Sequence, residues 1–146
     1  MRPRSRGSVQ LASSDPFAKP VIRHNYLTDP HDVKVNNAGF HVARRLNACS
    51  AFDRFRGEEV DPGLATKSDA EISAYNRKTL GSHYHPSGSC KMGVDEMSVV
   101  DPKLRVHGIE GLRVADASIM PFVTSGNTNA PTIMIGEKAA DIILSA

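Results

Sequence analysis

The chain has 146 residues, of which 40% are hydrophobic and 23% are charged, a composition typical of a globular protein rather than a disordered or fibrous one. The net charge is only +2, there is no Trp, and outside Arg2, Arg4 and Arg6 the basic residues are scattered, which argues against a nucleic-acid platform. Apolar runs are too short for a membrane span, and the basic start lacks the apolar segment of a signal peptide, so we expect a cytoplasmic chain.

Two short strands are predicted near the N-terminus. Val9 and Leu11 alternate with polar residues, a pattern typical of a half-buried strand. Residues 21–27 form a second strand-like stretch, which Asp29 and Pro30 are expected to end.

Two helices are predicted next. From about Asp32 the apolar spacing is helical, and one stripe contains Val35, Ala38, Val42 and Leu46. A charged, turn-rich connection over residues 53–67 follows. Ser68 and Glu71 then have the spacing of a capping box, which opens a second helix. Its expected inner side contains Ile72, Tyr75 and Thr79.

The C-terminal part mixes loop, strand and helix signals. Residues 82–98 show no periodicity and contain two Gly and a Pro, so we predict a loop. Residues 104–107 and 112–115 are predicted strands around a turn. Pro131 suits the first turn of a helix that ends near Leu144.

No strand in this sequence is followed by a glycine-rich phosphate loop. Neither GxGxxG nor GxxxxGK[ST] occurs. The backbone cradle that binds the pyrophosphate of a dinucleotide is therefore not encoded in these residues.

The loop around His85 is a candidate for general-base chemistry. The following Pro86 restricts the backbone of His85 to extended geometry. An imidazole, with an ordinary pKa of about 6.5, is well suited to take a proton at neutral pH. Two alternatives stay open: an ordinary loop histidine, or a zinc module. The zinc ligands would be His83, His85 and Cys90, with His107 as a fourth. We expect Cys90 and Cys49 to be reduced thiols.

The segment from Asp116 to Pro131 is a second candidate. It contains small and amide side chains and runs into the last predicted helix. A helix N-terminus presents unpaired N–H groups and favours an anion or an electron-rich carbonyl. The alternative is ordinary capping by Asn127 or Asn129.

Several segments follow one another in an order that is more specific than any single motif. They are Pro3–Leu11, Ser14–Pro16, Asn25–Leu27, Tyr84–Gly93, Val100–Pro102, Leu104–Gly108, Gly111–Ser118, Ser125–Met134 and Glu137–Asp141. Read in this order, they resemble the C-terminal region of the glucose-methanol-choline (GMC) oxidoreductases, which are FAD-dependent alcohol oxidases and dehydrogenases. The resemblance covers nearly the whole chain.

The resemblance implies an α+β fragment. We expect part of an antiparallel substrate-domain sheet with helices, over about residues 1–98. Residues 99–146 would return to the FAD-binding α/β domain and supply its last strand and its C-terminal helix.

The resemblance also implies site residues. His85 matches the active-site histidine of the family. Asn127 matches the second catalytic position and is similar to the choline dehydrogenase-like branch. Asp116 and Ala117 match residues beside the ribityl-phosphate part of FAD. Asn127, Thr128 and Asn129 match the stretch beside the flavin's pyrimidine ring. His83 has no family role.

By this resemblance, His85 would take the hydroxyl proton of a small alcohol while hydride passes to flavin N5. The N-terminal FAD-binding part of such an enzyme, with its glycine fingerprint, would be a required partner. We therefore expect the 146 residues alone to be poorly stable, to bind FAD weakly or not at all, and to turn over no substrate. The alternative is a non-catalytic remnant or one half of a split enzyme.

Overall fold

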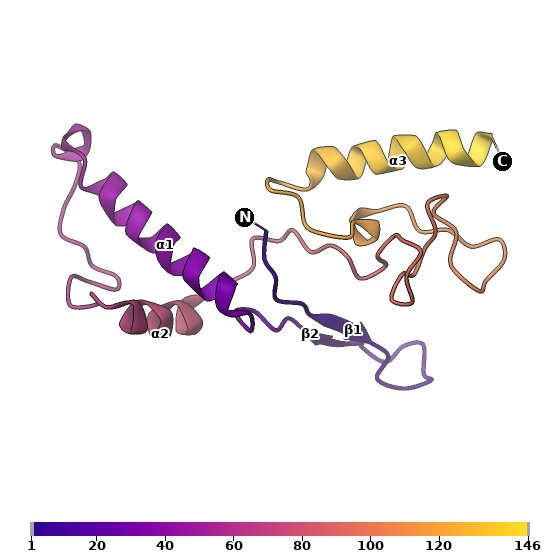
Figure 1. Ribbon diagram of the computed structural model, residues 1–146, viewed down its shortest axis with the longest axis horizontal. Helices are drawn as coiled ribbons and strands as arrows, with labels where there is room; N and C mark the ends of the chain where they lie inside the picture. The colour runs from indigo at the N-terminus through magenta and orange to yellow at the C-terminus, as the bar shows by residue number, and fades with distance from the viewer. Residues whose placement is uncertain (1, 146) are drawn as a thin grey trace. The chain divides into compact units, whose positions relative to one another are not determined.

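The computed structural model describes residues 2–145 (Figure 1). Its short strands β1 and β2 form a two-stranded sheet, and three α-helices follow, so the predicted α+β class is confirmed at this coarse level. The elements in chain order are β1 (Ser8–Gln10), β2 (Val21–Arg23), α1 (Pro30–Asn47), the 3₁₀ turn η1 (Ser50–Phe52), α2 (Asp69–Thr79), the 3₁₀ turn η2 (Ala117–Ile119) and α3 (Asn129–Leu144).

The chain divides into two compact units. One contains Ser8–Ile22 and the described residues from Ser82 onward, and the other contains Pro3–Gly7 and Arg23–Gly81. We call them the α3 unit and the α1–α2 unit. The division at residues 98 and 99 expected from the family resemblance concerns the domains of a larger enzyme, and it stays a prediction.

The β1–β2 pair is present, but its predicted burial is wrong. Val9 and Leu11 are 54% and 88% exposed. The predicted inner face of β1 is thus not covered by the residues that the structure describes. A two-stranded sheet has too little area to bury a face by itself, and it needs further strands or a helix packed against it.

Helix α1 begins earlier than the apolar pattern predicted. Asp29 caps it, since its side chain accepts a hydrogen bond of 2.7 Å from the N–H of His31, and Pro30 occupies the first turn. The pair predicted to end a strand therefore starts a helix. At Gly39, in the interior of the helix, an added Cβ atom would have no heavy atom of another segment within 4 Å.

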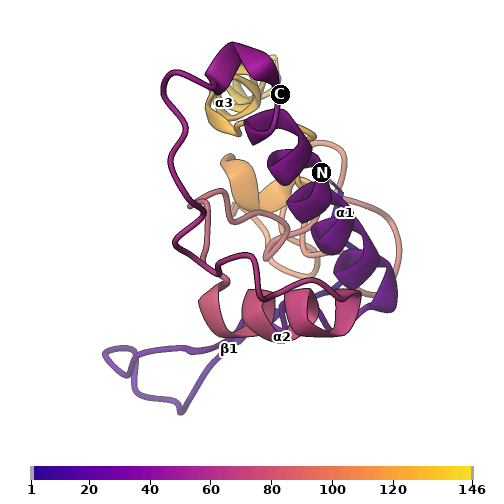
Figure 2. The same ribbon diagram turned by 90° about the vertical axis from the view of Figure 1, so that its left-hand side faces the viewer.

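The predicted inner stripe of α1 is wrong. Val35, Val42 and Leu46 are between 39% and 58% exposed, while Asn37 is buried. The reason lies in α2, which lies against α1 (Figure 2) and meets it partly through polar side chains. The amide of Asn37 donates to the carbonyl oxygen of Asp69 and to Ser73 Oγ, at 3.1 and 2.9 Å. The hydrogen bonds of Asn37, together with the edge contact of Phe40 with Tyr75, therefore define the face of α1 that meets α2.

Asp32 anchors the N-terminal segment to α1. Its buried carboxylate accepts hydrogen bonds from the N–H groups of Arg4 and Ser5, at 2.8 and 2.7 Å, and from Ser5 Oγ at 2.6 Å. Burial by itself raises the pKa of Asp32, but the hydrogen bonds from Ser5 and Arg4 outweigh it, so the pKa is lowered.

The capping box of α2 is confirmed. Ser68 Oγ accepts from the N–H of Glu71, while the Glu71 carboxylate accepts from the N–H groups of Ser68 and Lys67. These hydrogen bonds lower the pKa of Glu71. Ile72, one residue later, is fully buried.

In the α3 unit, the two strands predicted at 104–107 and 112–115 are replaced by isolated bridges, Val100 with Val106 and Arg105 with Arg113. At the start of the first predicted strand, Leu104 adopts a left-handed φ of 65° and buries its side chain in the core, a geometry that a strand does not allow. The last strand expected for an FAD-binding domain is therefore not formed by the described residues.

The core of the α3 unit lies under α3. The helix contributes Ile135 and Ala139, and η2 with its flank contributes Ile119 and Met120. The buried set is completed by Val100 and Leu104.

Much of the apolar surface of α3 stays exposed. Because the helix is apolar on several sides, one neighbour cannot cover all of them, and Ile133, Met134 and Ile143 are each more than half exposed.

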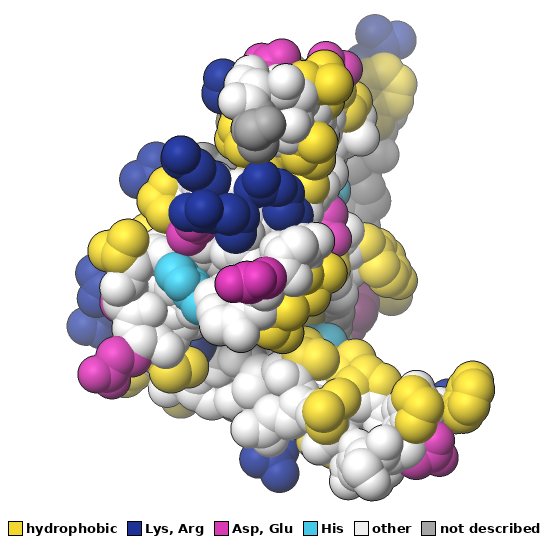
Figure 3. Space-filling view, turned by 90° about the vertical axis from the view of Figure 1, so that its right-hand side faces the viewer, with side chains coloured by type: hydrophobic (Ala, Val, Ile, Leu, Met, Phe, Trp, Pro, Cys, Tyr) yellow, Lys and Arg dark blue, Asp and Glu magenta, His cyan; other side chains and the backbone are white. Residues whose placement is uncertain are grey.

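In the space-filling view hydrophobic side chains lie next to a group of Lys and Arg side chains (Figure 3). At the C-terminal end of α3 a hollow of about 270 Å³ is lined by Lys103, Arg105, Arg113, Ile142 and Ser145. Cations near a helix C-terminus complement its partial negative charge.

A search of residues 2–145 finds no helix that combines the length and the apolar character required to cross a bilayer.

The capping box gives a test of the α1–α2 unit. Ser68→Ala removes the acceptor for the Glu71 N–H and is expected to lower the free energy of unfolding by about 1 kcal/mol. Ser68→Thr keeps an oxygen at this position and is expected to stay within a few tenths of a kcal/mol of the wild-type chain. Urea unfolding followed by circular dichroism measures both. Equal losses of unfolding free energy in the two variants would show that the oxygen of Ser68 does not stabilise the helix.

Candidate functional site

The loop that contains His85 is held by backbone hydrogen bonds. The N–H groups of Cys90 and Met92 donate to the carbonyl oxygens of Ser118 and Ile119, at 3.0 and 2.8 Å. A parallel bridge joins Met92 to Val100. The loop therefore follows η2 and the core of the α3 unit, although it forms no regular element of its own, as predicted.

Two residues near His85 have left-handed backbones. Tyr84, directly before it, has a φ of 60°, and Gly88 has a φ of 86°. A Cβ atom at Gly88 would lie 3.2 Å from the carbonyl oxygen of Met120. The loop thus passes close to the end of η2 at a point where glycine avoids both strain and contact.

His85 is half-buried and contacts the start of α3. Its Nδ1 atom lies 2.9 Å from Oγ1 of Thr128, across 43 residues of sequence. This contact brings His85 to the residue that follows Asn127. Two of the segments selected by sequence, the histidine loop and the stretch before the last helix, therefore meet.

The start of α3 lacks a side-chain cap from its own N-cap residue. Thr128 is 8% exposed, and its hydroxyl makes no capping hydrogen bond. The carbonyl oxygen of Thr128 accepts from the N–H and from Oγ1 of Thr132, at 3.0 and 2.6 Å. Asn127 and Asn129 are exposed on either side. The predicted capping by Asn127 or Asn129 is not the arrangement found, because the N-cap is Thr128.

Asp116 and Ala117 lie at η2. The carboxylate of Asp116 accepts from the N–H of Ser118 at 2.7 Å and so caps this short turn. Ala117 is half-buried and packs against the core. Helix α3 contacts η2, so these two residues belong to the same unit as His85 and Thr128.

The zinc hypothesis gains no support from the described part of the chain. Residues 2–145 contain no cluster of three or more His, Cys, Asp or Glu side chains able to hold a metal ion. His83 is exposed, and His107 donates from Nε2 to the carbonyl oxygen of Gly93 at 3.1 Å. Cys90 and Cys49 are both free thiols, as predicted.

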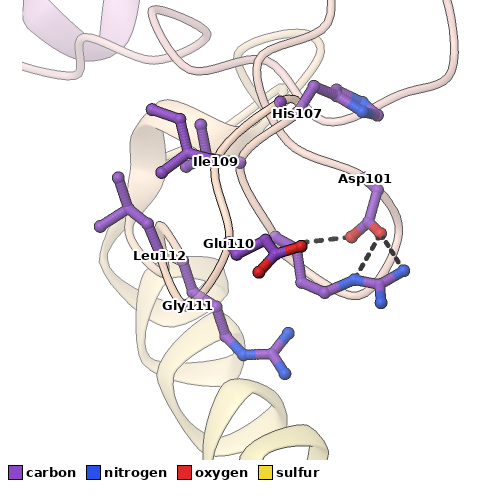
Figure 4. A pocket seen from close by; sticks show the side chains of 10 residues that line it. Asp101, His107, Ile109, Glu110, Gly111 and Leu112 are labelled. Carbon is purple, nitrogen blue, oxygen red and sulfur yellow. Dashed lines mark hydrogen bonds and ion pairs between the residues drawn. The ribbon is translucent and has the colours of Figure 1, made fainter.

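A cavity of about 550 Å³ lies in the turn formed by residues 105–113, with Asp101 at its edge (Figure 4). Arg105 contacts the Asp101 carboxylate at 2.6 Å and holds the pKa of Asp101 at about 2. Of the candidate residues, only His107, the possible fourth zinc ligand, lines this cavity. None of the residues matched to the catalytic or flavin-binding positions of the family does, so we place the candidate site at His85.

The side chain of Thr128 is the feature that sequence reasoning missed. Thr128 was selected only as part of the stretch beside a flavin. Its contact with His85 joins two segments that are remote in sequence, and no local pattern signals it. The carbonyl groups of Ser118 and Ile119 that hold the loop have no sequence signal either.

A sequence model of the GMC oxidoreductase family matches residues 3–136. Among curated relatives, the oxygen-dependent choline dehydrogenase of Sinorhizobium fredii is 54% identical over 143 residues, which are 97% of this chain and 26% of that protein. The oxygen-dependent choline dehydrogenase of Burkholderia thailandensis is 52% identical over 143 residues, which are 98% of this chain and 25% of that protein. The chain therefore spans about a quarter of these relatives.

Solved structures agree with this result. An FAD-dependent oxidoreductase from Chaetomium thermophilum matches with a TM-score of 0.92 and 33% identity, over 98% of this chain and 25% of that one. A fungal aryl-alcohol oxidase matches with a TM-score of 0.88 and 38% identity, over 99% and 24% of the two chains.

Gly88 offers a test of how the loop is held. Gly88→Ala places a side chain at a left-handed φ and against the Met120 carbonyl, so we expect a loss of roughly 1–2 kcal/mol in the free energy of unfolding. The matched control is Gly81→Ala, where a Cβ atom meets nothing within 4 Å. Its effect is expected to stay within about 1 kcal/mol of zero. Urea unfolding of both variants decides, and equal effects would contradict the proposed close approach.

Proposed function

Because this chain belongs to the GMC oxidoreductase family, we propose that it supplies the catalytic side chains of an FAD-dependent enzyme that oxidises the CH–OH group of a small, choline-like alcohol. The observation that carries this proposal is the 2.9 Å contact between His85 and Thr128. That contact brings a candidate base to the start of α3, beside Asn127. The loop that contains His85 and the segment that contains Asn127 lie in one unit, which supports the proposal.

His85 is proposed to be the general base. Its Nδ1 atom already has a partner in Thr128, so Nε2 is the ring atom left to take the proton of the substrate hydroxyl. Pro86 restricts the backbone of His85, and the hydrogen bonds of Cys90 and Met92, further along the same loop, hold the loop on η2. A base positioned in this way typically contributes about 10²- to 10⁴-fold to the rate.

Asn127 is proposed to orient the substrate. It is exposed, and it directly precedes the residue that contacts His85. Its amide can donate a hydrogen bond to the alcohol oxygen while His85 accepts the proton. Fixing that oxygen holds the reacting C–H bond in a productive direction.

The start of α3 fits one edge of a flavin. Because the Thr128 side chain turns to His85 rather than capping the helix, the partial positive charge of this helix end is available to an electron-rich group. The backbone of Thr128 and the side chains of Asn127 and Asn129 would hold that edge. Asp116 and Ala117, at η2, would lie beside the ribityl-phosphate part. Bound FAD would supply the hydride acceptor.

The remaining part of the cofactor site would come from residues outside this chain. These 146 residues contain no glycine fingerprint for the pyrophosphate. We therefore propose an FAD-binding N-terminal part as the required partner, with residues 99–146 completing its domain and residues 1–98 contributing to the substrate domain. The exposed apolar side chains of α3 are consistent with further packing in such an assembly.

The base assignment is tested in a chimera, in which this chain replaces the matching region of the Sinorhizobium fredii enzyme. His85→Ala is expected to slow flavin reduction by choline at least about 100-fold, since no other group takes the hydroxyl proton. Rapid mixing under anaerobic conditions measures this rate from the bleaching of the flavin absorbance.

His83→Ala is the matched control, because His83 is exposed two residues away and has no proposed role. We expect its rate to stay within about threefold of the parent, as for most exposed positions away from a site. If His85→Ala slowed reduction less than about tenfold, the base would have to be another group.

The chain by itself is expected not to retain FAD, because it lacks the pyrophosphate cradle. Purified chain mixed with FAD and then desalted should be colourless, whereas the chimera should stay yellow. Absorbance near the flavin band after gel filtration measures the difference. Stoichiometric FAD on the chain alone would contradict the need for a partner.

A further inference from the structure

The hydroxyl of Thr128 contacts a histidine of another segment and does not cap its own helix. A Thr at a helix N-cap ordinarily accepts a hydrogen bond from the second or third N–H of its helix. Thr128 makes no such bond, although it is the N-cap of α3. Its buried Oγ1 lies instead 2.9 Å from Nδ1 of His85.

The position of this hydroxyl is fixed from its own helix. The carbonyl oxygen of Thr128 accepts from the N–H of Thr132 at 3.0 Å and from its Oγ1 at 2.6 Å. The backbone that carries the hydroxyl is therefore tied to the first turn of α3, which in turn packs on η2. On the other side, the histidine loop is bonded to the same η2 turn through Cys90 and Met92. Both partners of the contact thus rest on one support.

The chemistry of the contact limits the protonation of the ring. A neutral imidazole carries its proton on one nitrogen and a lone pair on the other. If Nδ1 carries the proton, it donates to Oγ1, and Nε2 keeps the lone pair that a base needs. After Nε2 has taken a proton, Nδ1–H still donates to the same oxygen. One acceptor at Oγ1 therefore suits the ring both before and after proton transfer.

We propose that Thr128 is a positioning residue, whose hydroxyl accepts a hydrogen bond from Nδ1–H of His85 and so keeps Nε2 free as the basic nitrogen. This inference rests on the proposed function of His85 as a base, and it assigns the Thr128 side chain a role separate from the one proposed for its backbone beside FAD. A neighbouring group that holds the correct tautomer supports a histidine base without touching the substrate.

The first test needs no substitution. The choline dehydrogenase chimera is labelled with ¹⁵N-histidine, and His85 is assigned by the signal lost in His85→Ala. At a pH where the ring is neutral, the nitrogen chemical shifts report which nitrogen carries the proton. We expect the Nδ1–H tautomer. A predominant Nε2–H tautomer would overturn the proposal.

Two variants then separate positioning from simple packing. Thr128→Val keeps the branched shape but removes the hydroxyl, whereas Thr128→Ser keeps the hydroxyl and removes a methyl group. We expect Thr128→Val to shift the His85 signals toward the Nε2–H tautomer and to lower kcat about 10- to 100-fold with little change in KM. Thr128→Ser is expected to keep the wild-type tautomer and to stay within about threefold of the wild-type kcat.

The outcomes distinguish this inference from the proposed function. A Thr128→Val enzyme with unchanged tautomer and kcat would overturn the positioning role, as would a Thr128→Ser enzyme as impaired in both as Thr128→Val. Full activity of His85→Ala would instead defeat the base assignment, while the tautomer spectra would still report whether Thr128 orients the ring. If Thr128→Val loses its flavin, the wild-type spectrum and Thr128→Ser still decide.

Discussion

The candidate site depends on one constraint, the backbone ladder that fastens an irregular loop to η2. Residues 82–98 have no helix or strand to direct His85. Their N–H groups at Cys90 and Met92 instead donate to the carbonyl oxygens of Ser118 and Ile119, and Ile119 is buried in the core beneath α3. Because helix, turn and loop share this core, the imidazole of His85 and the hydroxyl of Thr128 meet at 2.9 Å. Without the ladder, the loop would have to order itself at a large cost in conformational entropy.

The two units are stabilised by different means. The α3 unit has an apolar core that includes fully buried Val100, yet α3 still exposes Ile133 and Met134. In the α1–α2 unit, the helices meet through the buried amide of Asn37. The Arg44 guanidinium there lies against Glu59, and the hydrogen bonds between them raise the pKa of Arg44 and lower the pKa of Glu59. Polar contacts of this kind specify one arrangement of two helices but supply little hydrophobic stabilisation. Helix α3 thus exposes apolar side chains in a chain that spans 26% of the length of its relative.

Thr128 links the two chemical tasks proposed for the start of α3. Its side chain is directed to His85 and is absent from the helix cap. The same choice therefore gives the proposed base a partner and leaves the positive end of the helix to face a flavin edge. A capping hydroxyl at this position would serve neither task.

The sequence by itself determined what depends on neighbours a few residues apart. The capping box at Ser68, the helix that contains Pro131, the loop around His85 and the order of motifs that indicates the family all follow from local spacing. Tertiary structure decided the rest. The buried face of α1 depends on the hydrogen bond between the amide of Asn37 and Ser73 of α2. Leu104, at the start of a predicted strand, has a left-handed backbone, and its side chain is buried in a core assembled from distant segments. The contact of His85 with Thr128 joins residues 43 apart. Such contacts follow from the packing of the whole unit, and a local pattern carries no information about which remote group will be near.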